Sequence, residues 1–88
     1  MGVSDNFIGL IQRTSDGFIR DNIYMVDKSL LARALVNIDP QYQEKIFKNM
    51  AGGSAEEVKR LIAGLGNIDS DAIESAQREI MSLASQVI

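Results

Sequence analysis

Apolar residues in this chain recur at intervals of three and four, and no stretch shows the sustained alternation of a β-strand. A spacing of i, i+3, i+4 and i+7 places side chains on one face of an α-helix. The clearest case follows Asp27, whose carboxylate can cap a helix N-terminus. Its apolar stripe consists of Leu30, Leu31, Ala34, Leu35 and Ile38. This pattern constrains the chain to a helical fold in which one face of each helix builds the core.

Two helices are predicted before this one. We expect Ser4 to cap the first helix and Ser15 or Asp16 to cap the second, because their side-chain oxygens accept hydrogen bonds from the free amides of a first turn. Met25 falls on a stripe position, so we predict that it fills the core. The other residues expected to face the core here are Phe7, Leu10, Ile11, Ile19, Ile23 and Tyr24.

Three more helices are predicted after it. Asp39 and Pro40 indicate the start of the fourth, because Asp caps a helix and Pro suits its first position. Ser54 and Glu57 have the spacing of a capping box for the fifth helix. The connector 67–69 leads into the sixth. The residues expected to face the core are Tyr42 or Gln43, Ile46, Phe47, Met50, Val58, Leu61, Ile62, Leu65, Ile73, Ala76 or Gln77, Ile80, Leu83, Ala84 and Val87.

Six helices with short connections predict a compact all-α fold, an armadillo-like bundle of packed helix pairs. We expect residues 1–88 to form a single domain, because this length suits one small core and no linker divides the chain.

The composition excludes several classes of function. The chain contains no cysteine and no histidine, so it lacks disulfides, thiolate metal sites and the commonest general base. A net charge of −3 argues against nucleic-acid binding, which needs a basic surface. No apolar run approaches the ~20 residues of a membrane helix, and the N-terminus lacks the basic region of a secretory signal. We therefore expect a soluble cytoplasmic protein that needs no cofactor.

Two carboxylate pairs are the remaining candidates for acid–base or cation chemistry. Glu56 with Glu57, and Asp69 with Asp71, fall where the fifth and sixth helices are expected to begin. Acidic side chains favour that position because they complement the helix dipole. Neither pair has the ligand spacing of a calcium loop, and residues 52–54 lack the lysine of a phosphate-binding loop. We predict helix-terminus roles for these carboxylates and no enzymatic activity.

The basic and apolar surface residues are candidates for protein binding. Lys59 and Arg60 predict a small positive ridge on the fifth helix, and Lys48 is expected to pair with Glu44 four residues earlier. An apolar face at the end of the last helix predicts self-association. That face consists of Leu83, Val87 and Ile88.

Two stretches carry a resemblance to a known family. The first is Glu-Lys-Ile-Phe-Lys-Asn-Met at 44–50, and the second is Ile-Glu-Ser-Ala-Gln-Arg-Glu-Ile at 73–80. Together with Val26 and Asp27 upstream and Gly66 between them, they resemble the C-terminal domain of the FliG family of flagellar rotor switch proteins. The similarity covers residues of about 19 to 84. Core and capping positions carry much of it, so it predicts the fold before the function.

The resemblance also implies a set of functional positions. In that family the C-terminal domain faces the membrane stator, and charged side chains on one ridge transmit torque. The corresponding positions here are Val36, Gly53, Arg60, Leu61 and Asp69. Three of them are uncharged, and Arg60 and Asp69 have the opposite sign to the usual family residue. Because charges set orientation and partner choice, this difference implies altered stator engagement.

The function implied by the resemblance is a non-catalytic interaction module of the flagellar rotor and switch complex. Its expected partners are the cytoplasmic loop of the stator or neighbouring subunits of the switch ring, at the cytoplasmic face of the inner membrane. The expected partner-binding residues are Glu56, Lys59, Arg60 and Asp69. The alternative is a helical-repeat adaptor or regulatory module that acts outside the motor. The chain is expected to be either a fragment of a full subunit or a short paralogue.

Overall fold

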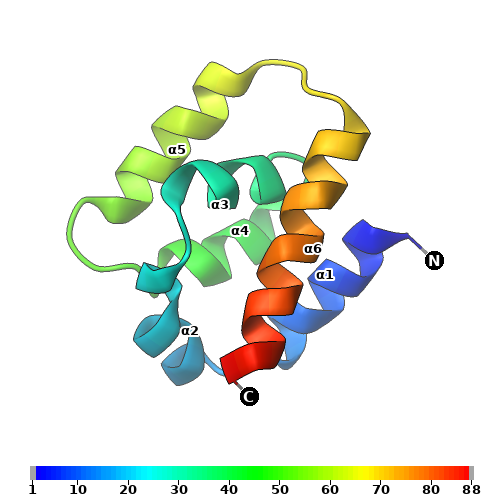
Figure 1. Ribbon diagram of the computed structural model, residues 1–88. Coiled ribbons are helices and arrows are strands. Elements are labelled where there is room, and N and C mark those ends of the chain that lie inside the picture. The colour runs from blue at the N-terminus through cyan, green and yellow to red at the C-terminus, as the bar shows by residue number, and fades with distance from the viewer. Residues whose placement is uncertain (1, 88) are drawn as a thin grey trace.

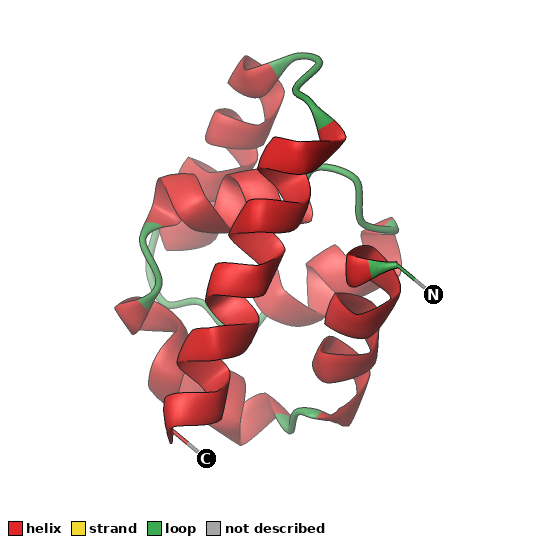
Figure 2. Ribbon diagram, turned by 45° about the vertical axis from the view of Figure 1, so that its right-hand side comes forward, coloured by secondary structure: helices red, strands yellow, loops and turns green. Residues whose placement is uncertain are grey.

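The computed structural model describes residues 2–87, without the side chain of Val87. The elements in chain order are α1 (Val3–Arg13), α2 (Asp16–Asn22), the 3₁₀-helix η1 (Ile23–Met25), α3 (Lys28–Leu35), α4 (Pro40–Phe47), α5 (Ser54–Leu65) and α6 (Ser70–Val87) (Figure 1). Helices joined by short loops make up the described chain, which contains no strand (Figure 2). The predicted all-α fold with six α-helices is confirmed.

Helix α3 lies at the centre of the fold. It packs against α5 on one side and α6 on the other, while α1 packs against α6 and α4 (Figure 1). Leu31, Ala34 and Leu35 of α3 are at most 1% exposed. Helices that enclose α3 on both sides explain why its stripe forms the centre of the core. The Cα radius of gyration is 11.9 Å, close to the ~12 Å typical of a compact chain of this length.

Three predicted N-caps are confirmed. The side chains of Ser15, Asp27 and Asp39 accept backbone amide hydrogen bonds of 3.1, 3.2 and 3.2 Å in the first turns of α2, α3 and α4. Pro40 is the first residue of α4, as its missing N–H favours. These caps depend only on residues close in sequence, which is why the sequence predicts them.

The predicted Ser4 cap is wrong. Gly2 is the N-cap and helix α1 begins at Val3, two residues earlier than a Ser4 cap implies, and the Asp5 carboxylate accepts a 3.3 Å hydrogen bond from the Gly2 amide. The Ser4 hydroxyl instead donates to Oε1 of Gln77, at 2.9 Å. A residue far away in sequence therefore takes the oxygen that was expected to cap the helix.

The predicted capping box at the start of α5 is also wrong. Gly53 occupies the N-cap position, and Ser54 is already the first helical residue. The Ser54 amide donates to the carbonyl of Ala51, at 3.2 Å, in the preceding turn. Glu57 pairs with Lys28 of α3, at 3.4 Å, rather than with the start of its own helix.

Three apolar side chains predicted to face the core are exposed: Tyr24 (79%), Met25 (49%) and Leu61 (38%). Tyr24 and Met25 belong to η1, whose three residues per turn rotate side chains away from the stripe of a 3.6-residue helix. Leu61 lies on α5, which packs chiefly against α3 and so leaves part of its apolar stripe uncovered.

Polar contacts tie the ends of the helices together. The Lys45 ammonium donates to the carbonyls of Ile11 and Gln12, at 2.8 and 3.3 Å, and so caps the C-terminus of α1 from α4. Gln77 of α6, with no exposed surface, donates to the carbonyl of Ala34, at 3.0 Å. These bonds satisfy carbonyls that have no partner within their own helix.

The start of α2 is bound to the end of α4. Nδ2 of Asn49 donates to Oδ1 of Asp16 at 3.2 Å, and Nζ of Lys48 lies 3.4 Å from Oδ2 of Asp16. The hydrogen bond from Asn49 and the nearby ammonium groups of Lys48 and Lys45 lower the pKa of Asp16. Lys48 was predicted to pair with Glu44; that prediction is wrong, because the fold brings Asp16 closer to its ammonium.

Candidate protein-interaction site

Helix α5 and the start of α3 display a band of charged side chains, which we call the α5 charged face. It consists of Lys28, Glu56, Glu57, Lys59 and Arg60. Nζ of Lys28 lies 3.4 Å from Oε2 of Glu57, and Nζ of Lys59 lies 3.5 Å from Oε2 of Glu56. The four paired side chains keep between 42% and 62% of their surface exposed. Exposed pairs of this kind add little stability, so these charges remain available for intermolecular contacts.

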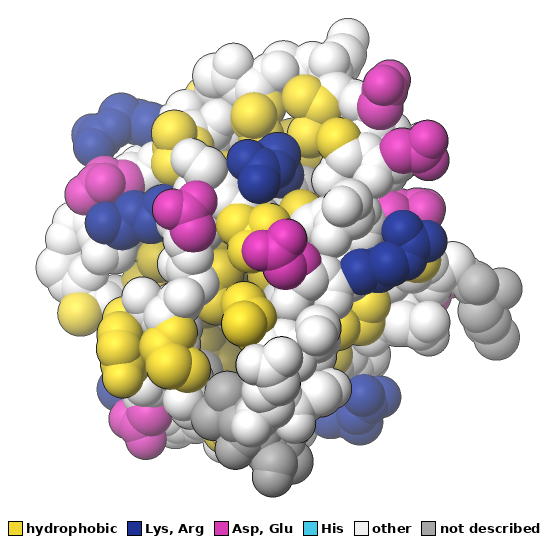
Figure 3. Space-filling view, viewed as in Figure 1, with side chains coloured by type: hydrophobic (Ala, Val, Ile, Leu, Met, Phe, Trp, Pro, Cys, Tyr) yellow, Lys and Arg dark blue, Asp and Glu magenta, His cyan; other side chains and the backbone are white. Residues whose placement is uncertain are grey.

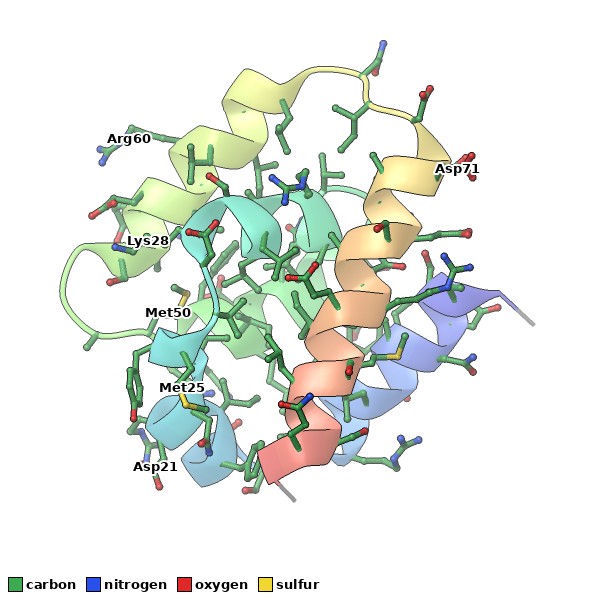
Figure 4. All side chains as sticks on the ribbon, in the orientation of Figure 1. Asp21, Met25, Lys28, Met50, Arg60 and Asp71 are labelled. Carbon is green, nitrogen blue, oxygen red and sulfur yellow. The ribbon has the colours of Figure 1, made fainter. Side chains whose placement is uncertain are left out.

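Arg60 is the cation of this face with no ion pair in the described part of the chain. Its side chain is exposed and projects outward from α5 (Figure 4). Lys59 differs, because its ammonium also lies 5.2 Å from the centroid of the Phe47 ring, within cation–π range. The Phe47 ring of α4 and the carboxylate of Glu56 restrain the Lys59 ammonium, whereas Arg60 has no ion pair or cation–π contact among the described residues.

Asp69 does not join the α5 charged face. It lies in the connector before α6, beyond the C-terminal end of α5, and its side chain is exposed. Glu56 and the end of α5 at Leu65 are nine residues apart, which spans roughly 13 Å along a helix. The structure thus places Glu56, Lys59 and Arg60 together on one helix and Asp69 outside that group.

The carboxylates are dispersed over helix starts. Glu56 and Glu57 lie in the first turn of α5, and Asp71 lies in the first turn of α6. Within residues 2–87 no group of three or more His, Cys, Asp or Glu side chains is placed to hold a metal ion. None of the described helices has both the length and the apolarity that a membrane crossing requires.

A second surface feature is an apolar groove that sequence analysis did not predict. We call it the α1–α6 groove; its walls come mainly from α1, α2, η1 and the C-terminal half of α6, and it holds about 640 Å³. None of its described lining residues is charged. Figure 3 shows apolar atoms gathered in the centre and lower left of this face, with charged side chains around them. Leu10, Leu83 and Ala84 line it, although their spacing in sequence looks the same as that of fully buried positions.

Comparison with known proteins places this helical fold in a family. The FliG C-terminal domain family matches residues 7–88. The chain belongs to the FliG C-terminal domain family. It is 32% identical over 87 residues to the flagellar motor switch protein FliG of Vibrio cholerae. The matched region covers 99% of this chain and 24% of that relative. No solved structure matches the chain.

Two further FliG proteins are similar to this member of the family. The flagellar motor switch protein FliG of Pseudomonas aeruginosa is 30% identical over 87 residues, with 99% of this chain and 25% of the relative covered. That of Borreliella burgdorferi is 34% identical over 83 residues, with 94% and 23% covered. The chain thus spans about a quarter of the length of the FliG relatives it matches.

The two stretches that carry the FliG resemblance contribute buried and capping side chains to the packing of the helices. The stretch 44–50 contributes Ile46 and Phe47, which are 6% and 7% exposed, and Lys45, which caps α1. The stretch 73–80 contributes the buried Gln77. These residues hold the helices together, whereas the paired charges of the α5 charged face are exposed and add little stability.

Proposed function

We propose that this chain is a non-catalytic protein-interaction module of the flagellar switch complex, formed as one domain by residues 1–88. It acts in the cytoplasm, at the face of the inner membrane where the flagellar basal body sits, and needs no cofactor. The observation that carries the proposal is the family match over residues 7–88, combined with exposed charges on α5 that contribute little to stability. The relatives are named flagellar motor switch proteins.

The partner of the α5 charged face is either the cytoplasmic loop of the stator or a neighbouring subunit of the switch ring. Glu56, Lys59 and Arg60 steer that encounter, and Asp69 contributes a separate contact beyond the end of α5. Charges on a rigid helix act chiefly on orientation and association rate, because their geometry is set before binding. A second copy of the chain is a further partner. Of the three residues predicted to drive self-association, Leu83 has a side chain that the structure describes. The side chain of Val87 and the whole of Ile88 lie outside the part of the chain that the structure describes.

The test is an amide NMR titration of the labelled chain with the isolated cytoplasmic loop domain of the stator, at low and then raised salt. We expect salt-sensitive shifts that cluster on α5, because exposed charge pairs are screened by salt. Arg60→Glu should weaken binding about tenfold, since it reverses the charge of the α5 charged face that has no ion pair among the described residues. Arg13→Glu is the matched control, because Arg13 is exposed on α1, away from the α5 charged face (Figure 1).

An unchanged spectrum of the folded chain would exclude the stator contact. The same titration with the remaining part of a FliG subunit would then separate a ring neighbour from a role outside the motor. If Arg60→Glu and Arg13→Glu weakened binding equally, the α5 charged face would not be the site.

A further inference from the structure

The α1–α6 groove exposes apolar surface that the described residues do not cover. It holds about 640 Å³ and, among the described residues, no charged side chain lines it. Phe18 and Leu83 in its walls are only partly buried. A contiguous apolar surface of this kind marks a site of association, because removing apolar surface from water lowers the free energy of the system. Its occupant must present an uncharged apolar surface of its own.

Such a surface lies directly beside the groove. Tyr24 and Met25 of η1 are 79% and 49% exposed. Met25 also forms part of the groove wall, so the protruding residues and the groove share one face of the molecule. Figure 4 shows the side chain of Met25 projecting from η1 near α2. The 3₁₀ geometry of η1 turns these two side chains outward, at the cost of leaving them in water.

We propose that this face binds a second copy of this chain in a twofold-symmetric dimer, in which Tyr24 and Met25 of each copy enter the groove of the other. A twofold interface requires one patch that complements itself. A protrusion and a groove of matching apolar character on the same face meet that requirement. This inference deepens the self-association part of the proposed function and does not depend on the stator contact.

Charge and size also favour a second copy. Arg20 and Asp21, both exposed, adjoin η1 on α2. Twofold symmetry can place each of them against the opposite charge of the other copy.

The accessible surface of the chain is 5202 Å², and a standard interface buries about 800 Å² per partner. One broad face of a molecule measuring 32 × 31 × 21 Å can supply that area. Because protrusion and groove lie on one face, the contact closes at the dimer and does not continue into filaments.

Sedimentation equilibrium over roughly 10 μM to 1 mM tests the dimer. We expect a monomer–dimer equilibrium and no larger species. Met25→Gln should raise the dissociation constant at least tenfold, because it places an amide in the apolar groove. Leu61→Gln is the matched control: Leu61 is a similarly exposed apolar residue, but it lies on α5, and its substitution should leave the constant unchanged. Circular dichroism checks that both variants remain folded.

Site-specific cross-linking tests the arrangement of the two copies. Because the chain contains no cysteine, only the introduced thiols react with a maleimide. Copies carrying Met25→Cys are mixed with mass-labelled copies carrying Ala84→Cys and treated with a short bis-maleimide. Ala84 lines the groove on α6, so mixed cross-links should exceed those between identical copies.

A chain that stays monomeric at the highest concentration would overturn the proposal. Equal effects of Met25→Gln and Leu61→Gln, or no excess of mixed cross-links, would do the same. A monomer whose groove binds an isolated amphipathic helix would assign the groove to a different partner. The stator titration probes contacts of α5, whereas sedimentation and cross-linking probe contacts of η1 and α6. Either proposal can therefore be overturned while the other stands.

Discussion

Gln77 shows how one buried amide holds three helices. Its Nε2 donates to the carbonyl of Ala34 and to Oδ1 of Asn37, at 3.0 and 3.1 Å, and its Oε1 accepts from Ser4 at 2.9 Å. Gln77→Leu keeps the volume but leaves these groups without a partner. We expect a loss of about 2–3 kcal/mol in the free energy of unfolding, measured by urea denaturation.

The control for Gln77 is the same substitution at an exposed glutamine. Gln41→Leu, in the first turn of α4, should change the free energy of unfolding by less than about 0.5 kcal/mol. Comparable losses in the two variants would show that the hydrogen bonds of Gln77 contribute nothing specific.

Asp16 predicts a pH dependence of stability. The hydrogen bond from Asn49, supported by Lys48 and Lys45, lowers the pKa of this carboxyl below its ordinary value of 3.8 in the folded state. A carboxyl with a lowered folded pKa contributes stability above its unfolded pKa and loses that contribution as pH falls through the folded pKa. The melting temperature of the native chain should therefore exceed that of Asp16→Asn at about pH 6, and the gap should shrink below about pH 3.

Thermal unfolding at both pH values measures this gap. Lys48→Gln retains the hydrogen bond from Asn49 to Asp16. At about pH 6 its melting temperature should therefore lie closer to that of the native chain than the melting temperature of Asp16→Asn does. A gap for Asp16→Asn of the same size at both pH values would contradict the role assigned to the charged carboxylate.

At the scale of elements, the end of α5 depends on one backbone conformation. Gly66 adopts φ +63° and ψ −140°, a region that L side chains rarely enter. Gly66→Ala should lower the free energy of unfolding by about 1–2 kcal/mol. Gly64→Ala is the matched comparison within α5, because a Cβ there meets nothing within 4 Å. It should stabilise the chain by about 0.5–1 kcal/mol. Urea titrations in which both substitutions shift stability in the same direction would refute this account.

The helix boundaries differ in how far they follow from sequence. Asp27 and Asp39 cap helices through amides two or three residues away, so the local sequence is sufficient. Ser4 has the same chemistry, yet its hydroxyl bonds Gln77, which is 73 residues away. η1 is a further case, because its 3₁₀ turn places Tyr24 in solvent where a continuous helical stripe predicts burial.

At the scale of the whole molecule, stability depends on which apolar stripes are covered on both sides. Leu35 has no exposed surface, whereas Leu61 is 38% exposed, although both occupy stripe positions. Leu35→Ala should therefore cost about 3–4 kcal/mol in the free energy of unfolding, from lost transfer and a cavity. Leu61→Ala should cost less than about 1 kcal/mol. Denaturant unfolding followed by circular dichroism provides the comparison, and similar losses would place Leu61 in the core after all.

The candidate interaction surfaces divide along the same line. Glu56, Lys59 and Arg60 fall together because a helix fixes the spacing of nearby residues, so their grouping follows from sequence. The position of Asp69 depends on the path of the connector after α5. Its distance in sequence from Arg60 therefore did not predict that it lies outside the α5 charged face. The α1–α6 groove combines residues from both ends of the chain, such as Leu10 and Leu83. No local pattern indicates that these two stripe residues meet at an opening.

Local sequence patterns are sufficient to predict the helical class, the caps that act over two or three residues, and the apolar stripes that supply the core. The sequence also contained the FliG-like stretches 44–50 and 73–80, because residues that hold helices together are restricted by packing. The packing of the helices sets which stripe positions remain exposed, which polar side chains form hydrogen bonds across helices, and that Met25 and the groove share a face. Those outcomes depend on contacts between distant segments, whose free energies arise only when the helices pack against one another.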